Sequence, residues 1–135
     1  MKPKVLFICT RNSSRSQMAE ALLTSLYGDT YEAYSAGIEP TEVNPHVVRV
    51  MAEIGINISQ KHSTGIEHYR GTKFDYVVTL CDHAKEICPF FPGEQLLHKN
   101  FKDPSKFKGS ENKILEEIRE IREEIKMWLL TTFKP

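Results

Sequence analysis

Short strand-like runs alternate with amphipathic stretches along this chain, and this alternation limits the possible folds more than any other feature. Four runs are short and bounded by polar or turn residues, which is typical of strands: residues 4–8, 31–36, 75–80 and 96–98. Apolar residues recur at helical spacing in three segments: residues 16–27, the stretch that begins with Asn44-Pro45, and residues 114–129. Strands that alternate with helices run parallel. The pattern therefore predicts an α/β fold, an open parallel four-stranded sheet with helices on both faces.

Length and charge narrow the class of protein. The chain has 135 residues, which fits a single domain spanning residues 1–135. Lys+Arg and Asp+Glu both number 18, so the positive excess typical of nucleic-acid-binding domains is missing from the sequence. No apolar stretch approaches the roughly 18 residues of a membrane span, and the N-terminal apolar run is too short for a secretory signal. We therefore expect a cytoplasmic monomer that binds neither nucleic acid nor membranes.

Two of the three cysteines directly follow predicted strands. Cys9 comes after the run at 4–8, and Cys81 comes after the run at 75–80. Ligands bind at the carboxyl ends of the strands in an open parallel sheet, so both thiols are expected at one functional edge. An odd number of cysteines, with Cys88 as the third, argues against a disulfide framework and leaves thiol chemistry or plain burial as explanations.

The loop after Cys9 has the composition of an anion-binding site. Its candidate binding residues are small, hydroxylated or basic: Thr10, Arg11, Asn12, Ser13, Ser14, Arg15 and Ser16. Backbone N–H groups and the positive end of the following helix attract an oxyanion, and Arg15 can grip two of its oxygens. The same field favours the thiolate form of Cys9, which makes Cys9 a candidate nucleophile. The alternative is a half-buried cysteine that ends a strand before an ordinary polar loop.

Residues 9–20 (CTRNSSRSQMAE) resemble the signature of the low-molecular-weight tyrosine phosphatase superfamily, and more closely that of its thioredoxin-coupled arsenate reductases. Further matches run through most of the chain: Tyr34-Ser35-Ala36-Gly37, residues 77–81 (VVTLC), residues 87–89 (ICP) and Asp103-Pro104. Gln17, where the phosphatases carry proline, also resembles the reductases. Two positions depart from the pattern, since Arg11 replaces a glycine and Ser14 replaces a cysteine. The resemblance implies a low-molecular-weight phosphatase-like fold.

The same resemblance implies roles for the site residues. Cys9 is the nucleophile, residues 10–15 bind the oxyanion, and Asp103 is the general acid. Cys81 and Cys88 correspond to the family's redox pair: Cys81 attacks the adduct of Cys9 with arsenic, Cys88 takes over Cys81, and thioredoxin reduces the resulting disulfide. The resemblance implies no metal and no tightly bound cofactor. It does suggest a monovalent cation, held near Asn12, Glu20 and Ser35.

The spacing of Cys81 and Cys88 makes a geometric demand on any disulfide between them. If residues 81–88 were helical, a rise of about 1.5 Å per residue would separate the two Cα atoms by about 10 Å. A disulfide tolerates about 7 Å at most, so this segment must unwind or loop out, helped by the break at Pro89. The alternatives are a buried, unreactive Cys88 or a zinc site with His83, whose spacing lacks the usual paired ligands.

Hypotheses from different functional classes stay open at this point. The first is the reduction of arsenate to arsenite with thioredoxin as electron donor. The second is a phosphatase for phosphotyrosine or small phosphomonoesters, which would use the same Cys9, Arg15 and Asp103. A third is an oxyanion-binding or thiol-sensing module without turnover. Only Cys81 and Cys88 distinguish the two enzymes, because hydrolysis needs water in place of a second thiol.

Overall fold

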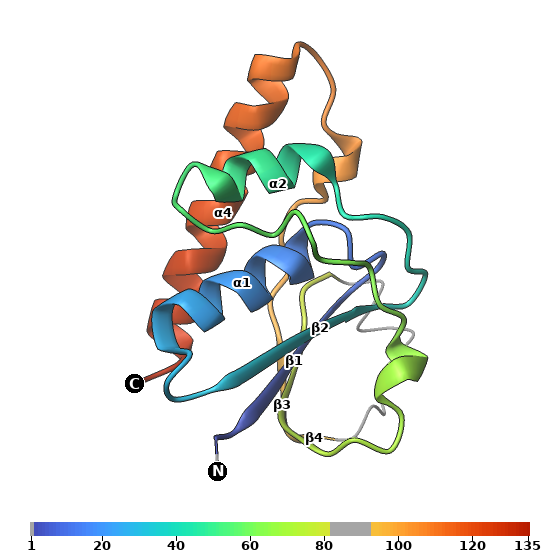
Figure 1. Cartoon of the computed structure of the whole chain (residues 1–135), viewed down its shortest axis with the longest axis vertical. Helices are drawn as coiled ribbons and strands as arrows, with labels where there is room; N and C mark the ends of the chain where they lie inside the picture. Colours follow the sequence, from blue (N-terminus) through green and yellow to red (C-terminus); the bar gives the residue numbers. More distant parts are fainter. Residues whose placement is uncertain (1, 82–92) are drawn as a thin grey trace.

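The computed structural model describes residues 2–81 and 93–135 (Figure 1). Their regular elements follow in this order: β1 (Lys4–Cys9), α1 (Arg15–Tyr27), β2 (Glu32–Gly37), α2 (Pro45–Ala52), the 3₁₀ helix η1 (Ile66–Tyr69), β3 (Phe74–Thr79), β4 (Gly93–His98), the 3₁₀ helix η2 (Pro104–Lys106) and α4 (Glu111–Thr132). Every predicted strand and helix is present. The largest shift among the strands is at β4, which begins at Gly93 rather than near Leu96. No helix within the described ranges has both the length and the apolar character needed to cross a membrane.

The four strands form one parallel sheet in the order β2-β1-β3-β4, so β1 is a central strand. Cys9 pairs with Gly37 of β2, and Ile8 pairs with Thr79 of β3. The carboxyl ends of these strands are therefore level, and Cys81, two residues beyond β3, lies at the same edge as Cys9. The predicted α/β fold is confirmed.

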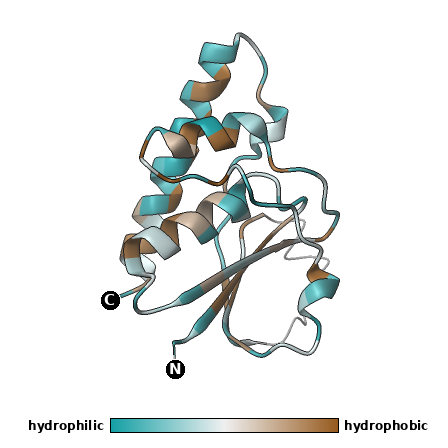
Figure 2. Ribbon diagram, in the orientation of Figure 1, coloured by the Kyte–Doolittle hydropathy of each residue, from teal (hydrophilic) through white to brown (hydrophobic). Residues whose placement is uncertain are grey.

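Both faces of the sheet are covered. Helices α1 and α4 lie over one face, and the stretch that contains η1 lies over part of the other (Figure 1). On the first face, Phe133 follows α4 and packs edge-on against Phe7, with ring centroids 6.4 Å apart. On the second, Tyr69 of η1 packs edge-on against Tyr34, at 5.7 Å. Leu6 and Phe7 point to opposite faces and are both fully buried, so β1 runs through the hydrophobic core (Figure 2).

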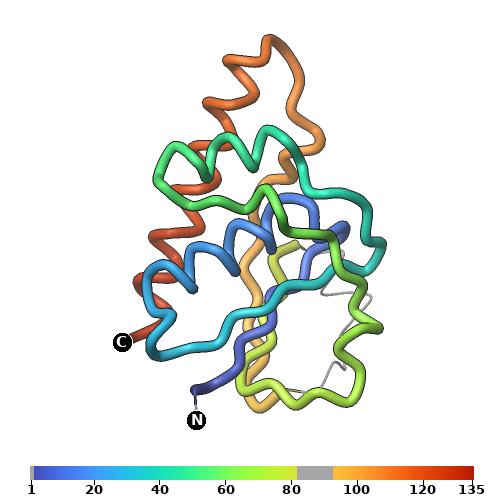
Figure 3. Tube along the Cα trace, viewed as in Figure 1, coloured from blue at the N-terminus to red at the C-terminus, as the bar shows by residue number. Residues whose placement is uncertain are grey.

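Two segments from other parts of the chain run past the loop that joins β1 to α1 (Figure 3). Residues 38–44 lead from β2 to α2, and residues 56–65 lead from α2 towards η1. The Asn44 N–H donates to the Ser13 carbonyl at 3.0 Å, and the Thr64 N–H donates to Asn12 Oδ1 at 2.8 Å. The loop is therefore held by backbone that is distant from it in sequence.

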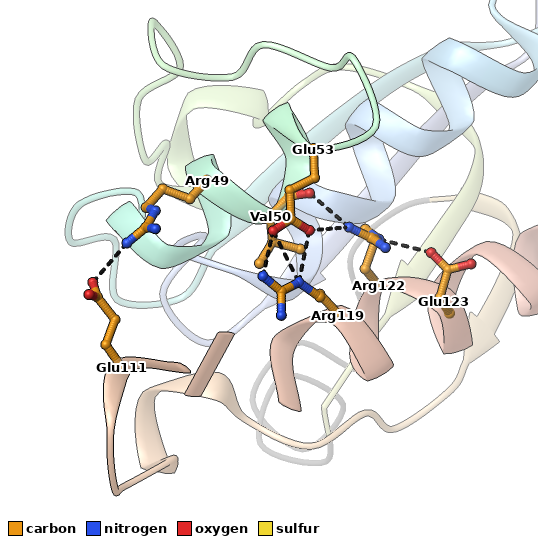
Figure 4. A network of polar contacts seen from close by, with 7 residues as sticks. All are labelled: Arg49, Val50, Glu53, Glu111, Arg119, Arg122 and Glu123. Atoms are coloured by element: carbon orange, nitrogen blue, oxygen red, sulfur yellow. Dashed lines mark hydrogen bonds and ion pairs between the residues drawn. The ribbon is translucent and has the colours of Figure 1, made fainter. Parts of the chain in front are cut away.

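A network of ion pairs joins the end of α2 to α4 (Figure 4). Glu53, the residue after α2, accepts hydrogen bonds from Arg119 at 2.7 Å and from Arg122 at 3.1 Å. Arg122 is only 11% exposed and also donates Nη1 to the Val50 carbonyl at 2.9 Å, which satisfies the C-terminus of α2. Hydrogen bonds from Arg119 are the largest cause that lowers the pKa of Glu53 below 4.5. The contribution of Glu53 to stability is therefore present above pH 4.5 and is lost as the pH falls through the lowered value.

We predict that Arg122→Met destabilises the fold more than Arg119→Met. Both variants keep an apolar stem, but only Arg122→Met removes a hydrogen bond to the Val50 carbonyl. The expected loss for Arg122→Met is about 1–2 kcal/mol, measured by urea unfolding. Arg119 makes an exposed ion pair and serves as the control. A larger loss for Arg119→Met would contradict the capping role.

Candidate active site

The loop between β1 and α1 turns its backbone carbonyl groups outwards. Each carbonyl of residues 9–14 accepts a hydrogen bond, and almost all of the donors lie in other segments. In the order of the carbonyls, the donors are the backbone N–H groups of Ile38, Glu39 and Thr41, the side chains of Ser63 and Gln17, and the N–H groups of Asn44 and Met18. Because the carbonyls are satisfied from outside, the N–H groups are left to face the interior of the loop.

The inward side of this loop has the character of an anion-binding site. The N–H groups of residues 11–17 donate to no backbone carbonyl or side chain in the described part of the chain. Helix α1 begins in the same stretch, and its N-cap residue Ser14 makes no side-chain capping bond. The unpaired N–H groups and the positive end of α1 thus belong to the same short stretch, a combination that attracts anions.

Asn12 holds the loop in shape from within. It is fully buried and has a φ of 52°, a left-handed conformation that asparagine tolerates better than most residues. Its Oδ1 accepts from the Thr64 N–H at 2.8 Å and from Gln17 Nε2 at 3.0 Å. The backbone donor at Thr64 identifies the acceptor end of the amide, so Nδ2 faces Ser16, to whose Oγ it donates at 2.7 Å. The Asn12 side chain thus links Thr64, Gln17 and Ser16, and it is not free to bind an oxyanion.

Cys9 lies beneath the loop at the end of β1. Its Sγ is 2.9 Å from Ser16 Oγ, and the residue is 2% exposed. Ser16 Oγ already accepts a hydrogen bond from Asn12 Nδ2, so its own hydroxyl proton can point towards the sulfur. The chain of contacts from Asn12 through Ser16 therefore fixes the position of the Cys9 sulfur beneath the loop.

Arg15, in the first turn of α1, is held by the loop that precedes η2. It is 6% exposed, and its Nη1 donates to the Phe101 carbonyl at 3.1 Å. Its Nη2 lies 3.7 Å from Asp103 Oδ2. The Phe101 carbonyl and the Asp103 carboxylate thus lie at the N–H edge of the Arg15 guanidinium, with which an oxyanion would pair.

Asp103 is at once the N-cap residue of η2 and the partner of Arg15. Its Oδ1 accepts from the Ser105 N–H at 3.0 Å and from Ser105 Oγ at 2.8 Å. Burial alone would raise the pKa of Asp103, but the two hydrogen bonds from Ser105 and the charges of Arg15 and Lys106 hold the pKa below its usual value. At neutral pH this carboxyl is therefore ionised, whereas a general acid must carry a proton when it acts.

Two cavities lie on either side of the contact between Arg15 and Asp103, and both residues line each cavity. The cavity over Cys9 measures about 10 Å³, enough for at most about one water molecule. The second, of about 440 Å³, is bordered by Thr10 and Cys81. Asp103 and Ser105 therefore border the small cavity over Cys9 together with Arg15.

Cys81 lies at the sheet edge where the sequence places it. It is 4% exposed, and its Sγ is 3.3 Å from the hydroxyl of Thr10, the residue after Cys9. Cys9 and Cys81 are both buried, and no disulfide joins them. Cys88 and His83, named above as redox or zinc candidates, lie outside the described residues. Within the described ranges no three His, Cys, Asp or Glu side chains form a cluster able to hold a metal ion.

The remaining loop residues have distinct surroundings. Arg11 is exposed, and its carbonyl accepts from the Thr41 N–H at 3.3 Å, so its side chain lies at the mouth of the site without disturbing the backbone. Ser13 and Ser14 line the small cavity over Cys9. Sequence reasoning missed Phe101 and Ser105, because one acts through a backbone carbonyl and the other looks like an ordinary turn residue.

The residues expected around a monovalent cation already have other partners. Glu20 Oε1 accepts from Ser35 Oγ at 2.7 Å, and Glu20 Oε2 pairs with Lys61 Nζ at 2.7 Å. Asn12 Oδ1 accepts two hydrogen bonds of its own. The oxygen atoms of this set therefore do not form a ready cation site.

Comparison with known proteins identifies the class to which this site belongs. Residues 4–134 match the family model described as low molecular weight phosphotyrosine protein phosphatase. An arsenate reductase from Halalkalibacterium halodurans is 44% identical over 125 residues, covering 92% of this chain and 90% of that protein. A solved arsenate reductase in its phosphate binding state has a TM-score of 0.83 at 32% identity, covering 97% of this chain and 95% of the other. The thioredoxin-dependent arsenate reductase of Corynebacterium glutamicum has a TM-score of 0.65 at 35% identity, covering 97% of this chain and 64% of that one.

The chain therefore belongs to the low molecular weight phosphotyrosine protein phosphatase family. Within that family it is similar to proteins that are named arsenate reductases. The resemblance seen in the sequence is confirmed.

We predict that Gly37→Ala disrupts the loop. A Cβ at Gly37 would lie 2.6 Å from the carbonyl carbon of Arg11 and from the backbone nitrogen of Asn12, and that backbone cannot shift without losing its outside donors. The expected destabilisation is about 1–3 kcal/mol, measured by urea unfolding. Gly65→Ala is the matched control, because its nearest neighbour is Pro40 Cγ at 3.4 Å. Equal losses in the two variants would contradict the steric argument.

We also predict that Ser105→Ala raises the pKa of Asp103. The variant keeps the backbone donor and loses the hydroxyl, which is one of the groups that lower this pKa. A carbon-detected NMR titration of the Asp103 carboxyl should therefore show its midpoint at higher pH than in the parent protein. Ser59→Ala, in an exposed turn, should leave the midpoint unchanged. An unchanged or lower midpoint in Ser105→Ala would refute the assignment.

Proposed function

We propose that this protein reduces arsenate to arsenite, with Cys9 as nucleophile and Cys81 as the second thiol. The observation that carries the proposal is the pair of buried cysteines at the ends of the adjacent parallel strands β1 and β3, linked through Thr10. A phosphatase needs only the first of them. The arsenate reductases among the relatives support the same activity here.

In the first step, arsenate binds in the loop and replaces Asp103 and the Phe101 carbonyl as the partner of the Arg15 guanidinium. The negative charge of the bound anion then raises the proton affinity of Asp103, which offsets the hydrogen bonds that keep it ionised. The Cys9 thiolate attacks arsenic, an S–As bond forms, and an As–O bond breaks. The bond that breaks is to a hydroxyl group of arsenate, which takes a proton from protonated Asp103 and leaves as water.

In the second step, the Cys81 thiolate attacks Cys9 Sγ. The S–S bond forms as the S–As bond breaks, and its two electrons reduce arsenic from the +5 to the +3 state, which releases arsenite. Cys88 then attacks Cys81, so the disulfide moves to Cys81–Cys88 and Cys9 becomes a thiolate again. The hydrogen bond between Thr10 and Cys81 orients the attacking sulfur at 3.3 Å from the Thr10 hydroxyl.

Thioredoxin is the proposed electron donor for the Cys81–Cys88 disulfide. A dithiol donor returns two electrons per turnover and leaves both cysteines reduced. One solved relative is a thioredoxin-dependent arsenate reductase, which supports this choice. A thiol cycle also suits the reducing cytoplasm that the sequence predicts.

A second candidate is phosphatase activity, which the family description favours. Cys9, Arg15 and Asp103 would act on a phosphomonoester as they do on arsenate, up to the covalent intermediate. Water would then complete hydrolysis in place of Cys81. The two activities would therefore share Cys9, Arg15 and Asp103, and only arsenate reduction would need Cys81.

The experiment is to measure arsenate-dependent NADPH oxidation with thioredoxin and thioredoxin reductase, alongside hydrolysis of an aryl phosphate. Cys9→Ser should lower both activities by about 10³-fold or more, because both need the nucleophile. Cys81→Ser should abolish arsenate reduction and keep the hydrolysis that the parent shows.

Two results would contradict the proposal. One is arsenate reduction by Cys81→Ser at the parent rate. The other is aryl phosphate hydrolysis by a parent protein that gives no arsenate-dependent NADPH oxidation, which would leave the phosphatase as the function.

A further inference from the structure

We propose that Lys61 is a positioning residue of the oxyanion loop, whose ammonium group beside Glu20 replaces the monovalent cation expected from the sequence. Lys61 lies outside every motif that identifies the family. It carries neither a substrate contact nor a thiol contact, so its effect on the site has to pass through other residues.

Glu20, the partner of Lys61, is a largely buried carboxylate. Its side chain is only 12% exposed, so its carboxylate needs a compensating charge. Ser35 Oγ donates to Oε1 at 2.7 Å, and Lys61 Nζ donates to Oε2 at 2.7 Å. Both oxygens are thus engaged, and the one positive charge paired with Glu20 in the described ranges belongs to Lys61.

Hydrogen bonds from the three residues that follow Lys61 connect it to the loop and to Gln17. The His62 carbonyl accepts from Gln17 Nε2 at 3.1 Å, Ser63 Oγ donates to the Asn12 carbonyl at 2.9 Å, and the Thr64 N–H donates to Asn12 Oδ1 at 2.8 Å. The ion pair with Glu20 ties this segment to α1. Ser63 and Thr64 in this segment in turn hydrogen-bond to Asn12, which holds the loop in shape.

Two further contacts connect Asn12 to the Cys9 sulfur through Ser16. Asn12 Nδ2 donates to Ser16 Oγ at 2.7 Å, and Ser16 Oγ lies 2.9 Å from Cys9 Sγ. Most exposed ion pairs contribute little to stability. This one differs because one partner is largely buried and because the segment it anchors makes three hydrogen bonds to the loop and to Gln17.

A tethered ammonium and a mobile cation make different predictions. A mobile cation stabilises the folded state in a saturable way that depends on its concentration, whereas a lysine side chain is always present. The parent protein should therefore show no specific dependence on K⁺. Removal of the Lys61 charge should expose the Glu20 carboxylate to a cation from solution and create that dependence.

The test compares thermal unfolding in KCl with unfolding in tetramethylammonium chloride at equal ionic strength, since this large ion cannot approach the carboxylate closely. The parent and the control Lys73→Met, which removes an exposed lysine elsewhere, should unfold at the same temperature in both salts. Lys61→Met should unfold at a lower temperature in tetramethylammonium chloride and recover as KCl is added, to a plateau. Lys61→Arg keeps the charge and should behave like the parent.

A second readout is the affinity for inorganic phosphate, measured by calorimetry in the same salts. Without K⁺, Lys61→Met should bind phosphate about tenfold more weakly than the parent, and KCl should restore the affinity, because coupling between two sites is reciprocal. This readout rests on the proposed oxyanion site, whereas the unfolding readout does not. If the parent protein binds no phosphate, the proposed oxyanion site is wrong. The role of Lys61 is then decided by the unfolding temperatures alone.

Two outcomes would overturn the role of Lys61. Saturable, K⁺-specific stabilisation of the parent would show that a cation binds while Lys61 is in place. Equal unfolding temperatures of Lys61→Met in the two salts would show that Glu20 needs no countercharge there. If Lys61→Met does not fold in either salt, the parent and Lys61→Arg still decide, since both must be independent of K⁺.

Discussion

The outward carbonyls of residues 9–14 are the constraint on which the site depends. Backbone carbonyls left without donors in a buried loop would cost more than the loop could recover, so the N–H groups can face inwards only if every carbonyl finds a donor outside. Those donors come from segment 38–44, from Ser63 and from α1. The surrounding chain is therefore part of the site even where it never touches a substrate.

Asn12 meets the same constraint from the inside. A left-handed residue at this position reverses the direction of the backbone, and its amide then links Thr64 and Gln17 on one side to Ser16 on the other. The close approach of Gly37 to the loop has the same origin, because the reversed backbone passes where a Cβ would otherwise lie. Orientation of the Cys9 sulfur follows from these contacts.

Arg15 already has partners within the protein. Asp103 and the Phe101 carbonyl contact the guanidinium, and the cavity over Cys9 is about 10 Å³. An oxyanion that binds Arg15 would compete with these two groups for the same guanidinium. The group expected to act as an acid thus first serves as an ionised partner of the arginine, which the residue type alone does not reveal.

Much of this arrangement could be predicted from the sequence, because it depends on local patterns. The strand runs, the Asn44-Pro45 helix start and the position of Cys9 and Cys81 after strands are of this kind. The 3₁₀ helix η1 could not be predicted, since residues 59–72 have no hydrophobic period. The partners Lys61, Thr64 and Phe101 were also missed, because each acts across 41 to 86 residues, two of them through backbone groups. The predicted exchange with Cys88 stays a prediction.

Disulfide mapping after a single exposure to arsenate distinguishes a thiol cascade from hydrolysis. Fully reduced protein is mixed with arsenate in the absence of thioredoxin, trapped with an alkylating agent, digested and analysed by mass spectrometry. If the proposed cascade operates, a Cys81–Cys88 disulfide and an alkylated Cys9 should be found, together with released arsenite. Three alkylated cysteines in a protein that hydrolyses an aryl phosphate would contradict it.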